Sequence, residues 1–565
     1  MKKQIGKNKK KFSLREFIWL GFNYTVGIGF IGTVGILGNG KAFGNDQSGV
    51  GLNTLWILAI LGIIAGIIAW AFAKMSRIYK SAQNGGAYIF VRGTFGKFLG
   101  IFVAFMMYVG MPFMITNQVM MMIKGSFSPS FVADLGGNHA WFVLDFGSFT
   151  DLWLDLIGIA IYMSSALIIF GGIRIYKKFA NTTAFIKWGA AALLILVAII
   201  MMFADVSTGD KAANIKAWGG ATGFSIGKIM TTFSTCFYFF AGFEIFSTAG
   251  ANVENPNRNI GLGVTLIMII STIFYIAIMF IFFMSIAPKD FSQNATMSAW
   301  NTWFNKDGSK FRWMYYLGPV TIIISAISLK INAAMQNSLY GGTALQPLCV
   351  EGYFPESMGK LNKDGLPLKA SMVNLVIVGI FILIWLALPD LIKGIQCAGH
   401  DKVNVGTDTE PNWVPYYWVY NDAFNVATLT EASAVVTIFV YMITLASAIT
   451  VSAKNNKMKL KLWETIAFNI ALIFLTVLFI YHYYDVAKRI YEGATGEGTG
   501  LIIGGAVEIG FIICAVVFCV VWYKTYYKKV LTKRNMTDVK IQMALDKEFA
   551  LIDDIAEKKN KFTVI

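Results

Sequence analysis

The sequence predicts an all-α integral membrane protein with twelve transmembrane helices, and three observations support this fold class. Hydrophobic residues make up 56% of the chain and charged residues only 14%, whereas soluble proteins carry roughly 25% charged residues. Apolar runs long enough to cross a bilayer recur along the whole chain. Two of these runs are interrupted in mid-span by small residues, at corresponding places in two halves of the sequence.

The apolar runs define the expected spans. The first run is longer than the apolar region of a signal peptide and is rich in glycine, so we do not expect it to be a cleaved leader. The expected spans are residues 17–38, 53–73, 98–123, 152–172, 184–204, 227–251, 262–287, 317–341, 369–388, 425–452, 462–484 and 500–523.

The spans divide into groups of five, five and two. The two interrupted runs open the first and second groups and would cross the bilayer in opposite directions, which is the relation that an inverted repeat requires. The expected parts are a tail at 1–16, a first repeat at 17–204, a second repeat at 227–452 with an outer loop at 389–424, two further spans in 462–523, and a tail at 524–565.

The formal net charge is +16, and its distribution predicts the orientation of the chain. Lysine and arginine concentrate in both tails and in the loops on the same side, while the opposite loops carry more acids. By the positive-inside rule, we expect both termini to be cytoplasmic in a multi-pass plasma-membrane protein. Anionic lipid head groups are a sufficient partner for the basic tails, so the charge does not indicate nucleic acid.

The outer loop at 389–424 is rich in tyrosine and tryptophan. Two interpretations stay open for it: an ordinary aromatic belt at the membrane interface, or a lid over an outer vestibule.

The first interruption centres on Gly27 and Gly29, which flank Ile28. Glycine permits an unwound backbone, and unpaired backbone groups at bilayer depth are tolerated only where they line a cavity. Amides that follow the break would attract a carboxylate, and the carbonyls of Thr25 and Val26 would attract a cation such as an ammonium group. The alternative is that the glycines merely let helices pack closely.

The second interruption places Glu244 well inside the hydrocarbon, where a charged side chain costs at least ~2.5 kcal/mol. Glu244 is therefore either a neutral acid hydrogen-bonded within the bundle or a residue of proton coupling or gating. The backbone of this interruption comprises Tyr238, Phe239, Phe240, Ala241 and Gly242.

Two lysines fall inside apolar runs. Lys187 lies in the first turns of span five, where it could either extend to the cytoplasmic interface or stay buried. Lys330 lies roughly 21 Å from the outer end of span eight, and its ammonium could occupy the place of a sodium ion or carry a proton.

Several function classes lack their motifs. The chain contains no Walker A sequence for ATP, no zinc-binding His-Glu-x-x-His and no Gly-x-Ser-x-Gly elbow. Its five cysteines and three histidines show no spacing typical of metal ligands. We therefore expect no cofactor, no metal and no enzymatic activity.

Four motifs, in order along the chain, resemble those of the amino acid–polyamine–organocation permeases. Residues 27–31 read Gly-Ile-Gly-Phe-Ile, and residues 84–88 read Asn-Gly-Gly-Ala-Tyr. Residues 240–244 read Phe-Ala-Gly-Phe-Glu and are followed at 254–260 by Glu-Asn-Pro-Asn-Arg-Asn-Ile. Residues 351–355 read Glu-Gly-Tyr-Phe-Pro.

This resemblance implies a LeuT-type five-plus-five inverted repeat with discontinuous helices 1 and 6, two additional carboxyl-terminal helices, and alternating access. It implies that Tyr238 can close over the substrate and that Lys187 lies where sodium-coupled relatives bind their ion. The substrate carboxylate would contact the amides of Gly27, Ile28 and Gly29. The substrate amino group would contact the carbonyls of Thr25, Val26, Phe239 and Phe240.

The chain also departs from the family pattern. Ile28 replaces the usual serine or threonine, Ala251 and Asn252 replace an acidic pair, and Thr343 replaces an arginine. These changes bear on side-chain selectivity and on cytoplasmic gating.

We therefore expect a secondary-active amino acid permease that takes up its substrate together with protons. An exchanger of the same fold stays an alternative, as does a non-transporting membrane sensor of nutrients. The sequence does not specify which amino acid is the substrate.

Overall fold

The computed structural model contains fifteen α-helices in the part of the chain that it describes. The described residues are 11–26, 50–79, 86–127, 144–203, 212, 215–216, 226–240, 242–246, 252–285, 312–350, 353–398, 403–404, 413–414, 426–454, 459–495 and 499–527. Four residues of the expected site, namely Gly27, Ile28, Gly29 and Ala241, lie outside these ranges.

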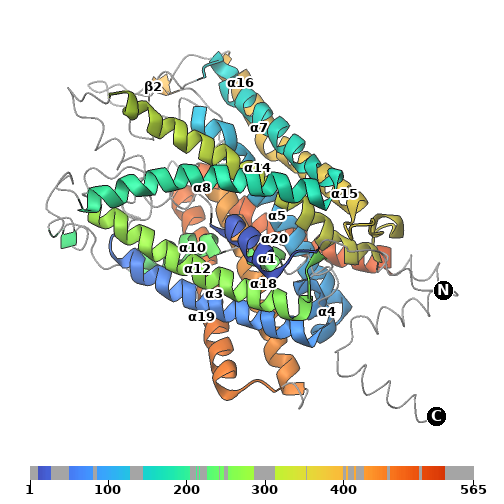
Figure 1. Ribbon diagram of the computed structural model, residues 1–565. Coiled ribbons are helices and arrows are strands. Elements are labelled where there is room, and N and C mark those ends of the chain that lie inside the picture. Colours follow the sequence, from blue (N-terminus) through green and yellow to red (C-terminus); the bar gives the residue numbers. More distant parts are fainter. Residues whose placement is uncertain are drawn as a thin grey trace, which may run out of the picture.

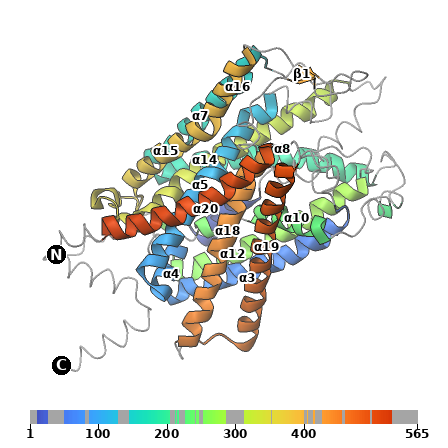
Figure 2. The same ribbon diagram turned by 180° about the vertical axis from the view of Figure 1, so that it is seen from behind.

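The helices follow the expected spans in order (Figures 1 and 2). Their bounds are α1 (Leu14–Thr25), α3 (Asn53–Ile78), α4 (Ala87–Phe95), α5 (Lys97–Phe127), α7 (Thr150–Ala166), α8 (Ile173–Phe203), α10 (Ile226–Phe237), α11 (Phe243–Phe246), α12 (Pro256–Ser285), α14 (Arg312–Val350), α15 (Leu368–Ile382), α16 (Leu388–Ala398), α18 (Val426–Lys454), α19 (Leu462–Thr495) and α20 (Thr499–Trp522). A π-helical turn at Leu383–Ala387 joins α15 to α16.

Eight helices in the described part of the chain are long and apolar enough to cross a membrane. They are Asn53–Ile78, Lys97–Lys124, Gly147–Gly171, Ile173–Ile200, Arg258–Met284, Leu368–Ile395, Ala434–Ala453 and Leu462–Glu492. The prediction of an all-α, multi-pass membrane fold is confirmed. The full count of twelve spans stays a prediction.

Several helices extend beyond the apolar run that predicted them. The helix α8 begins at Ile173 rather than at residue 184, and its first turns contain Arg174 and Lys177. The helix α14 continues to Val350, past the expected end at residue 341. An apolar run reports the length inside the hydrocarbon, whereas a backbone helix can continue into the polar interface on either side.

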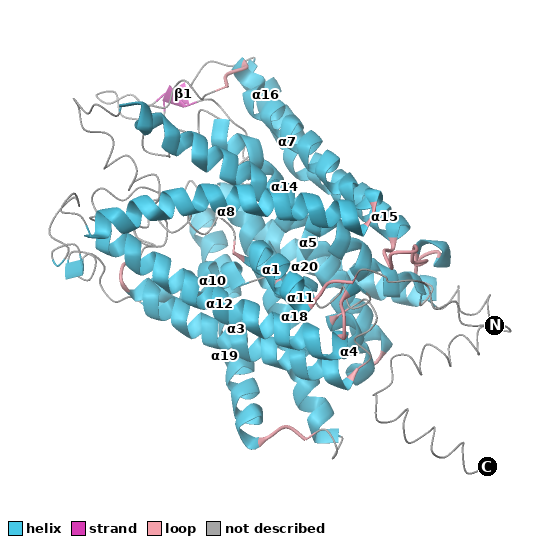
Figure 3. Cartoon of the chain, in the orientation of Figure 1, coloured by secondary structure: helices cyan, strands magenta, loops and turns pink. Residues whose placement is uncertain are grey.

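The helices pack as a bundle in which α12 lies along α3, α14 along α8, and α18 along α5 (Figures 1 and 2). The short helix α1 packs against α12, near the middle of the view in Figure 1. Figure 3 shows that the described structure is almost wholly helical, apart from one pair of two-residue strands. This pair, β1 (Val403–Asn404) and β2 (Trp413–Val414), is antiparallel and belongs to the expected outer loop.

Large apolar side chains are exposed along the outer faces of several helices. Ile63, Phe185, Ile273 and Ile473 are among the most exposed of them. Soluble proteins rarely expose such long apolar surfaces, so these faces fit contact with lipid.

The amino-terminal segment is held against two other parts of the chain. The Phe12 amide donates to the Asn252 carbonyl over 2.8 Å, and the Glu254 amide donates to the Phe12 carbonyl over 3.0 Å. The Lys177 ammonium lies 2.8 Å from the Glu16 carboxylate. Partial burial acts to raise the pKa of Glu16, but hydrogen bonds from Lys177 and from the Ser13 amide outweigh it and lower the pKa.

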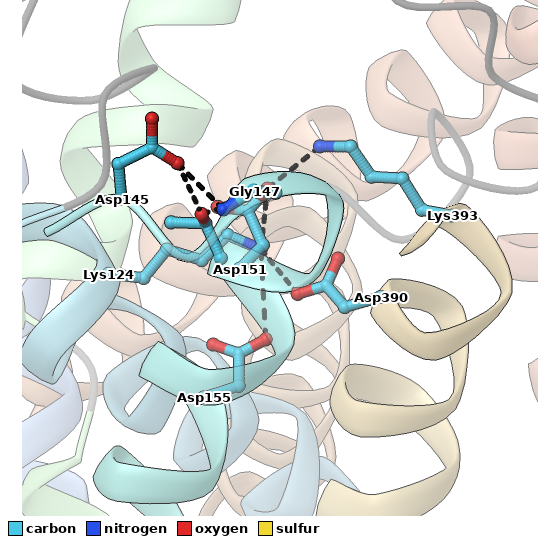
Figure 4. A network of polar contacts seen from close by, with 8 residues as sticks. Lys124, Asp145, Gly147, Asp151, Asp155, Asp390 and Lys393 are labelled. Carbon is cyan, nitrogen blue, oxygen red and sulfur yellow. Dashed lines mark hydrogen bonds and ion pairs between the residues drawn. The ribbon is translucent and has the colours of Figure 1, made fainter. Parts of the chain in front are cut away.

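A cluster of buried charges joins the ends of three helices (Figure 4). Lys124 of α5 donates to Asp390 of α16 over 2.5 Å and lies 3.7 Å from both Asp151 and Asp155 of α7. Lys393 of α16 lies 2.7 Å from Asp151. Because the Asp155 side chain has no exposed surface, its charge depends on Lys124 for compensation. The cluster therefore ties α5, α7 and α16 together.

Replacing Lys124 with methionine should destabilise the protein strongly. The change leaves buried aspartates without their central cation, and removing one partner of a buried ion pair costs about 3–5 kcal/mol. Thermal unfolding in detergent should show a much lower midpoint for Lys124→Met. Lys488→Met is the control, because Lys488 and Glu492 form a pair of which both side chains are more than half exposed. Equal midpoints for the two variants would contradict a structural role for the cluster.

Candidate functional site

The first break begins where α1 ends. Ser13 caps this helix at its start, in a reciprocal capping box with Glu16. The last helical residue is Thr25, and Val26 is already extended, with φ −90° and ψ 95°. The Val26 amide still donates to the Phe22 carbonyl over 2.8 Å, whereas the carbonyls of Asn23, Tyr24 and Thr25 have no partner amide within α1.

The second break separates α10 from α11. A 3₁₀ turn spans Tyr238–Phe240, and Gly242 follows with φ +103°, a conformation that glycine adopts at no steric cost. A Cβ atom on Gly242 would lie 2.8 Å from Cε1 of Tyr24, in the last turn of α1. The second break therefore lies directly against the end of the first.

One tyrosine of α12 connects the two breaks. The Tyr275 hydroxyl lies 3.0 Å from the Thr25 carbonyl oxygen and 2.9 Å from the Phe239 carbonyl oxygen. A hydroxyl has one proton to donate, so the two carbonyls share it. The Phe240 ring packs edge-on against the ring of the same tyrosine. The breaks of α1 and α10 thus face each other across a single side chain.

Lys187 of α8 is buried, with 1% of its surface exposed, so the buried alternative is the one observed. Its ammonium donates to the Asn23 carbonyl over 2.8 Å and to the Val26 carbonyl over 3.1 Å. The indole of Trp188 donates to the side-chain oxygen of Asn23. A cation at the carboxyl end of a helix interacts favourably with the helix dipole, so Lys187 stabilises the end of α1.

Glu244 is buried at the start of α11. Its carboxylate accepts a hydrogen bond from the Gly242 amide over 2.9 Å and another from the Tyr441 hydroxyl of α18. These bonds match the interpretation of Glu244 as an acid held within the bundle. They fix the backbone that follows the second break.

Polar side chains of α5 and α14 adjoin the first break. The Tyr24 hydroxyl donates to the side-chain oxygen of Asn337 over 2.7 Å, and the Asn337 amide donates to Gln118 over 3.2 Å. The Tyr24 ring also packs edge-on against Tyr340. Groups that could bind a polar ligand therefore surround the place where the two breaks meet.

The structure brings together most of the described site residues but not Lys330. Backbone atoms of Thr25, Val26 and Phe239 lie in one contact network with Lys187, as described above. Lys330 is half-buried on α14 and has no hydrogen bond or ion pair within the described residues.

Sequence reasoning missed Tyr275, Tyr441 and Asn337. A lone tyrosine in an apolar run is a weak signal, because aromatic residues are common in membrane helices. Of the three, Asn337 gives the clearest signal in the sequence, because a side-chain amide inside a membrane span needs a hydrogen-bonding partner.

The geometry defines a class of protein. Helix ends that meet in the buried interior of a bundle of membrane helices are typical of the binding sites of secondary transporters, and the ends of α1 and α10 meet at the Tyr275 hydroxyl. The fold and the site therefore describe an integral-membrane transporter rather than an enzyme.

Comparison with known proteins gives the family. Residues 12–495 match the amino acid permease family, and the chain belongs to it. This result confirms the resemblance to the amino acid–polyamine–organocation permeases.

Three relatives illustrate how far the similarity extends. An uncharacterized protein of Mycoplasma genitalium is 24% identical over 64% of this chain and 69% of its own length. The branched-chain amino acid permease BcaP of Lactococcus lactis is 24% identical over 57% of this chain and 65% of its own. An uncharacterized transporter of Mycobacterium tuberculosis is 27% identical over 44% of this chain and 50% of its own. The matches thus cover between half and about two thirds of these relatives.

Replacing Gly242 with alanine should damage both folding and transport. The left-handed backbone strains any residue with a Cβ by about 1–3 kcal/mol, and the new methyl group would press on Tyr24. The expected result is a lower melting midpoint in detergent and a loss of amino acid uptake in proteoliposomes.

Gly66→Ala in α3 is the matched control, because a Cβ placed at this position meets nothing within 4 Å beyond its chain neighbours and the backbone of its own helix. It should leave uptake unchanged and stabilise α3 slightly, by about 0.5–1 kcal/mol at most. If Gly242→Ala and Gly66→Ala have the same melting midpoint and the same uptake, then neither folding nor transport requires the backbone conformation at Gly242.

Proposed function

We propose that the protein is a secondary-active amino acid permease of the plasma membrane, which works by alternating access and couples uptake to protons. The observation that carries this proposal is the meeting of two helix breaks around Tyr275, beside a buried lysine. Family membership supports the substrate class.

The pairing of the helices supports the five-plus-five inverted repeat. In such a repeat, spans three and five of the first half correspond to spans eight and ten of the second. Span three (α5) packs along span ten (α18), and span five (α8) packs along span eight (α14). Exchanging the two halves turns span three into span eight and span ten into span five. The pair of spans three and ten thus becomes the pair of spans eight and five, as a twofold relation between the halves requires.

We propose the same boundaries as the sequence predicts. The repeats are 17–204 and 227–452, two further spans lie in 462–523, and the tails at 1–16 and 524–565 are cytoplasmic.

We propose that the site binds a zwitterion. The amides of Gly27, Ile28 and Gly29 would hold the carboxylate. The amino group would contact carbonyls of Thr25, Val26, Phe239 and Phe240, with Tyr238, Ala241 and Gly242 completing the second break. The Val26 carbonyl already accepts a bond from Lys187, but a carbonyl oxygen has a second lone pair for the substrate.

We propose that Lys187 carries the coupling proton. Within the described residues, its ammonium donates hydrogen bonds to the backbone carbonyls of Asn23 and Val26, at the end of α1, and contacts no carboxylate. Loss of the proton would therefore leave no uncompensated buried anion. It would weaken two hydrogen bonds that fix the end of α1, and so link protonation to the geometry of the first break. Lys330 is the second candidate, and Glu244 is the candidate for gating.

Purified protein in proteoliposomes should accumulate a radiolabelled amino acid when the external medium is acidic relative to the lumen. A competition panel of the common amino acids, at acidic and neutral external pH, should identify the substrates. Branched-chain amino acids belong in this panel because of the name of the Lactococcus relative. Binding without accumulation would contradict transport. Uptake that requires an amino acid inside the vesicle, and ignores the proton gradient, would indicate an exchanger.

Lys187→Met should abolish proton-driven accumulation, because the variant has no titratable group beside the first break. Lys330→Met should leave accumulation intact, since Lys330 makes no described contact with either break. Both variants are compared by initial uptake rate as a function of external pH. Full pH-dependent uptake by Lys187→Met would refute its coupling role. A loss confined to Lys330→Met would transfer that role to Lys330.

A further inference from the structure

Two rows of buried side chains face each other along the contact between α8 and α14. Within each row, successive members are three or four residues apart, so each row occupies one face of its helix. The α8 row consists of Tyr176, Ala180, Thr183 and Lys187. The α14 row consists of Ser325, Ser328, Asn332, Gln336 and Tyr340.

Hydrogen bonds connect the two rows. The Ser325 hydroxyl donates to the Lys187 carbonyl over 3.2 Å. The Asn332 side-chain amide donates to the Thr183 hydroxyl over 2.9 Å and to the Ala180 carbonyl over 2.8 Å. The Gln336 amide donates to the Asn332 side-chain oxygen over 2.5 Å. The two rows therefore form a buried polar strip, in which Asn332 and Gln336 are linked by hydrogen bonds to Ala180 and Thr183, and Ser325 bonds Lys187 separately.

Two atoms of the strip are buried and lack a hydrogen-bond partner among the described residues. They are the side-chain oxygen of Gln336 and the hydroxyl oxygen of Tyr176. Buried polar atoms are nearly always hydrogen-bonded, and ordered water is their usual partner when protein atoms are not available. The strip is thus equipped to bind water.

The strip has a direction. At one end the Lys187 ammonium contacts the carbonyls of the first break. At the other end Tyr176 packs edge-on against Phe12 of the amino-terminal segment, and the next residue, Lys177, pairs with Glu16. In the topology proposed above, this second end lies at the cytoplasmic surface.

We infer that the strip is the route by which the coupling proton leaves Lys187 for the cytoplasm. The inference rests on the proposed function, since it requires Lys187 to carry that proton. The Lys187 ammonium releases its proton to a water held by Thr183 and Asn332, and becomes a neutral amine. The proton then passes along waters held by Gln336 and the Tyr176 hydroxyl to the cytoplasmic solvent.

Asn332 and Gln336 act in this route as positioning residues. Amide side chains do not change their protonation state at physiological pH, so they orient the waters without taking up the proton. A purely structural role, as polar contacts between membrane helices, is the alternative that the experiment must exclude.

The test uses the full-length protein in proteoliposomes that contain a pH-sensitive dye. Two rates are measured: proton release into the lumen during net uptake, and exchange of labelled for unlabelled amino acid without a proton gradient. Exchange can proceed with Lys187 protonated throughout, whereas net uptake requires the proton to leave. Gln336→Leu should slow proton release and net uptake by about tenfold, the factor that the loss of one hydrogen bond carries, with exchange preserved. Gln336→Glu, which keeps a side chain able to bind water, should retain both rates.

Two further variants complete the design. Thr321→Val removes a hydroxyl from the same helix, one that bonds only the Leu317 carbonyl of α14 itself, and should leave both rates unchanged. Tyr176→Phe removes a hydroxyl that has no described hydrogen-bond partner, so this change should preserve the packing of the bundle. It therefore tests the route even if Gln336→Leu fails to fold. It should slow proton release several-fold.

The outcomes separate the inference from the proposed function. If the wild-type protein transports amino acids without moving protons, proton coupling fails and this route fails with it. If the wild type moves protons and Gln336→Leu and Tyr176→Phe release them at the wild-type rate, only the route is overturned. Equal loss of exchange and of proton release in both variants would show that the strip is structural, and would also overturn the route.

Discussion

The inability of lipid to hydrogen-bond is the constraint on which this structure depends. The helices α1 and α10 end at residues buried inside the bundle, and their terminal backbone carbonyls must find partners within the protein. Two other helices and the helix after the second break supply them: Tyr275 of α12 bonds carbonyls of both breaks, Lys187 of α8 bonds the end of α1, and Glu244 of α11 bonds the Gly242 amide. Of these groups, Tyr275 bonds both breaks and so also holds them beside each other.

This solution has a functional consequence. In the proposed mechanism, Lys187 carries the coupling proton, so the hydrogen bonds that it donates to the end of α1 would depend on its protonation. The buried polar strip between α8 and α14 runs from this lysine to the amino-terminal segment. The end of α1, the lysine and the strip therefore lie next to one another, whereas the charge cluster around Lys124 joins α5, α7 and α16.

Much of the fold could be predicted from the sequence, because the bilayer imposes a simple rule on span length and polarity. The apolar runs marked the helices, and the glycines marked the second break, where Gly242 adopts φ +103°. The ends of helices were less predictable. The extension of α8 to Ile173 has no apolar signal, since the first turns of that helix are basic.

The sequence by itself determined the class of the protein and the presence of a lysine and a glutamate within apolar runs, while the burial of Lys187 was decided by the structure. Only the tertiary structure decided which groups those side chains bind. Tyr275 and Thr25 are 250 residues apart in the chain, and no local pattern reports a contact between them. Helix packing determines such pairs, because it depends on the shapes of whole helices, whereas periodicity records only which face of each helix is polar.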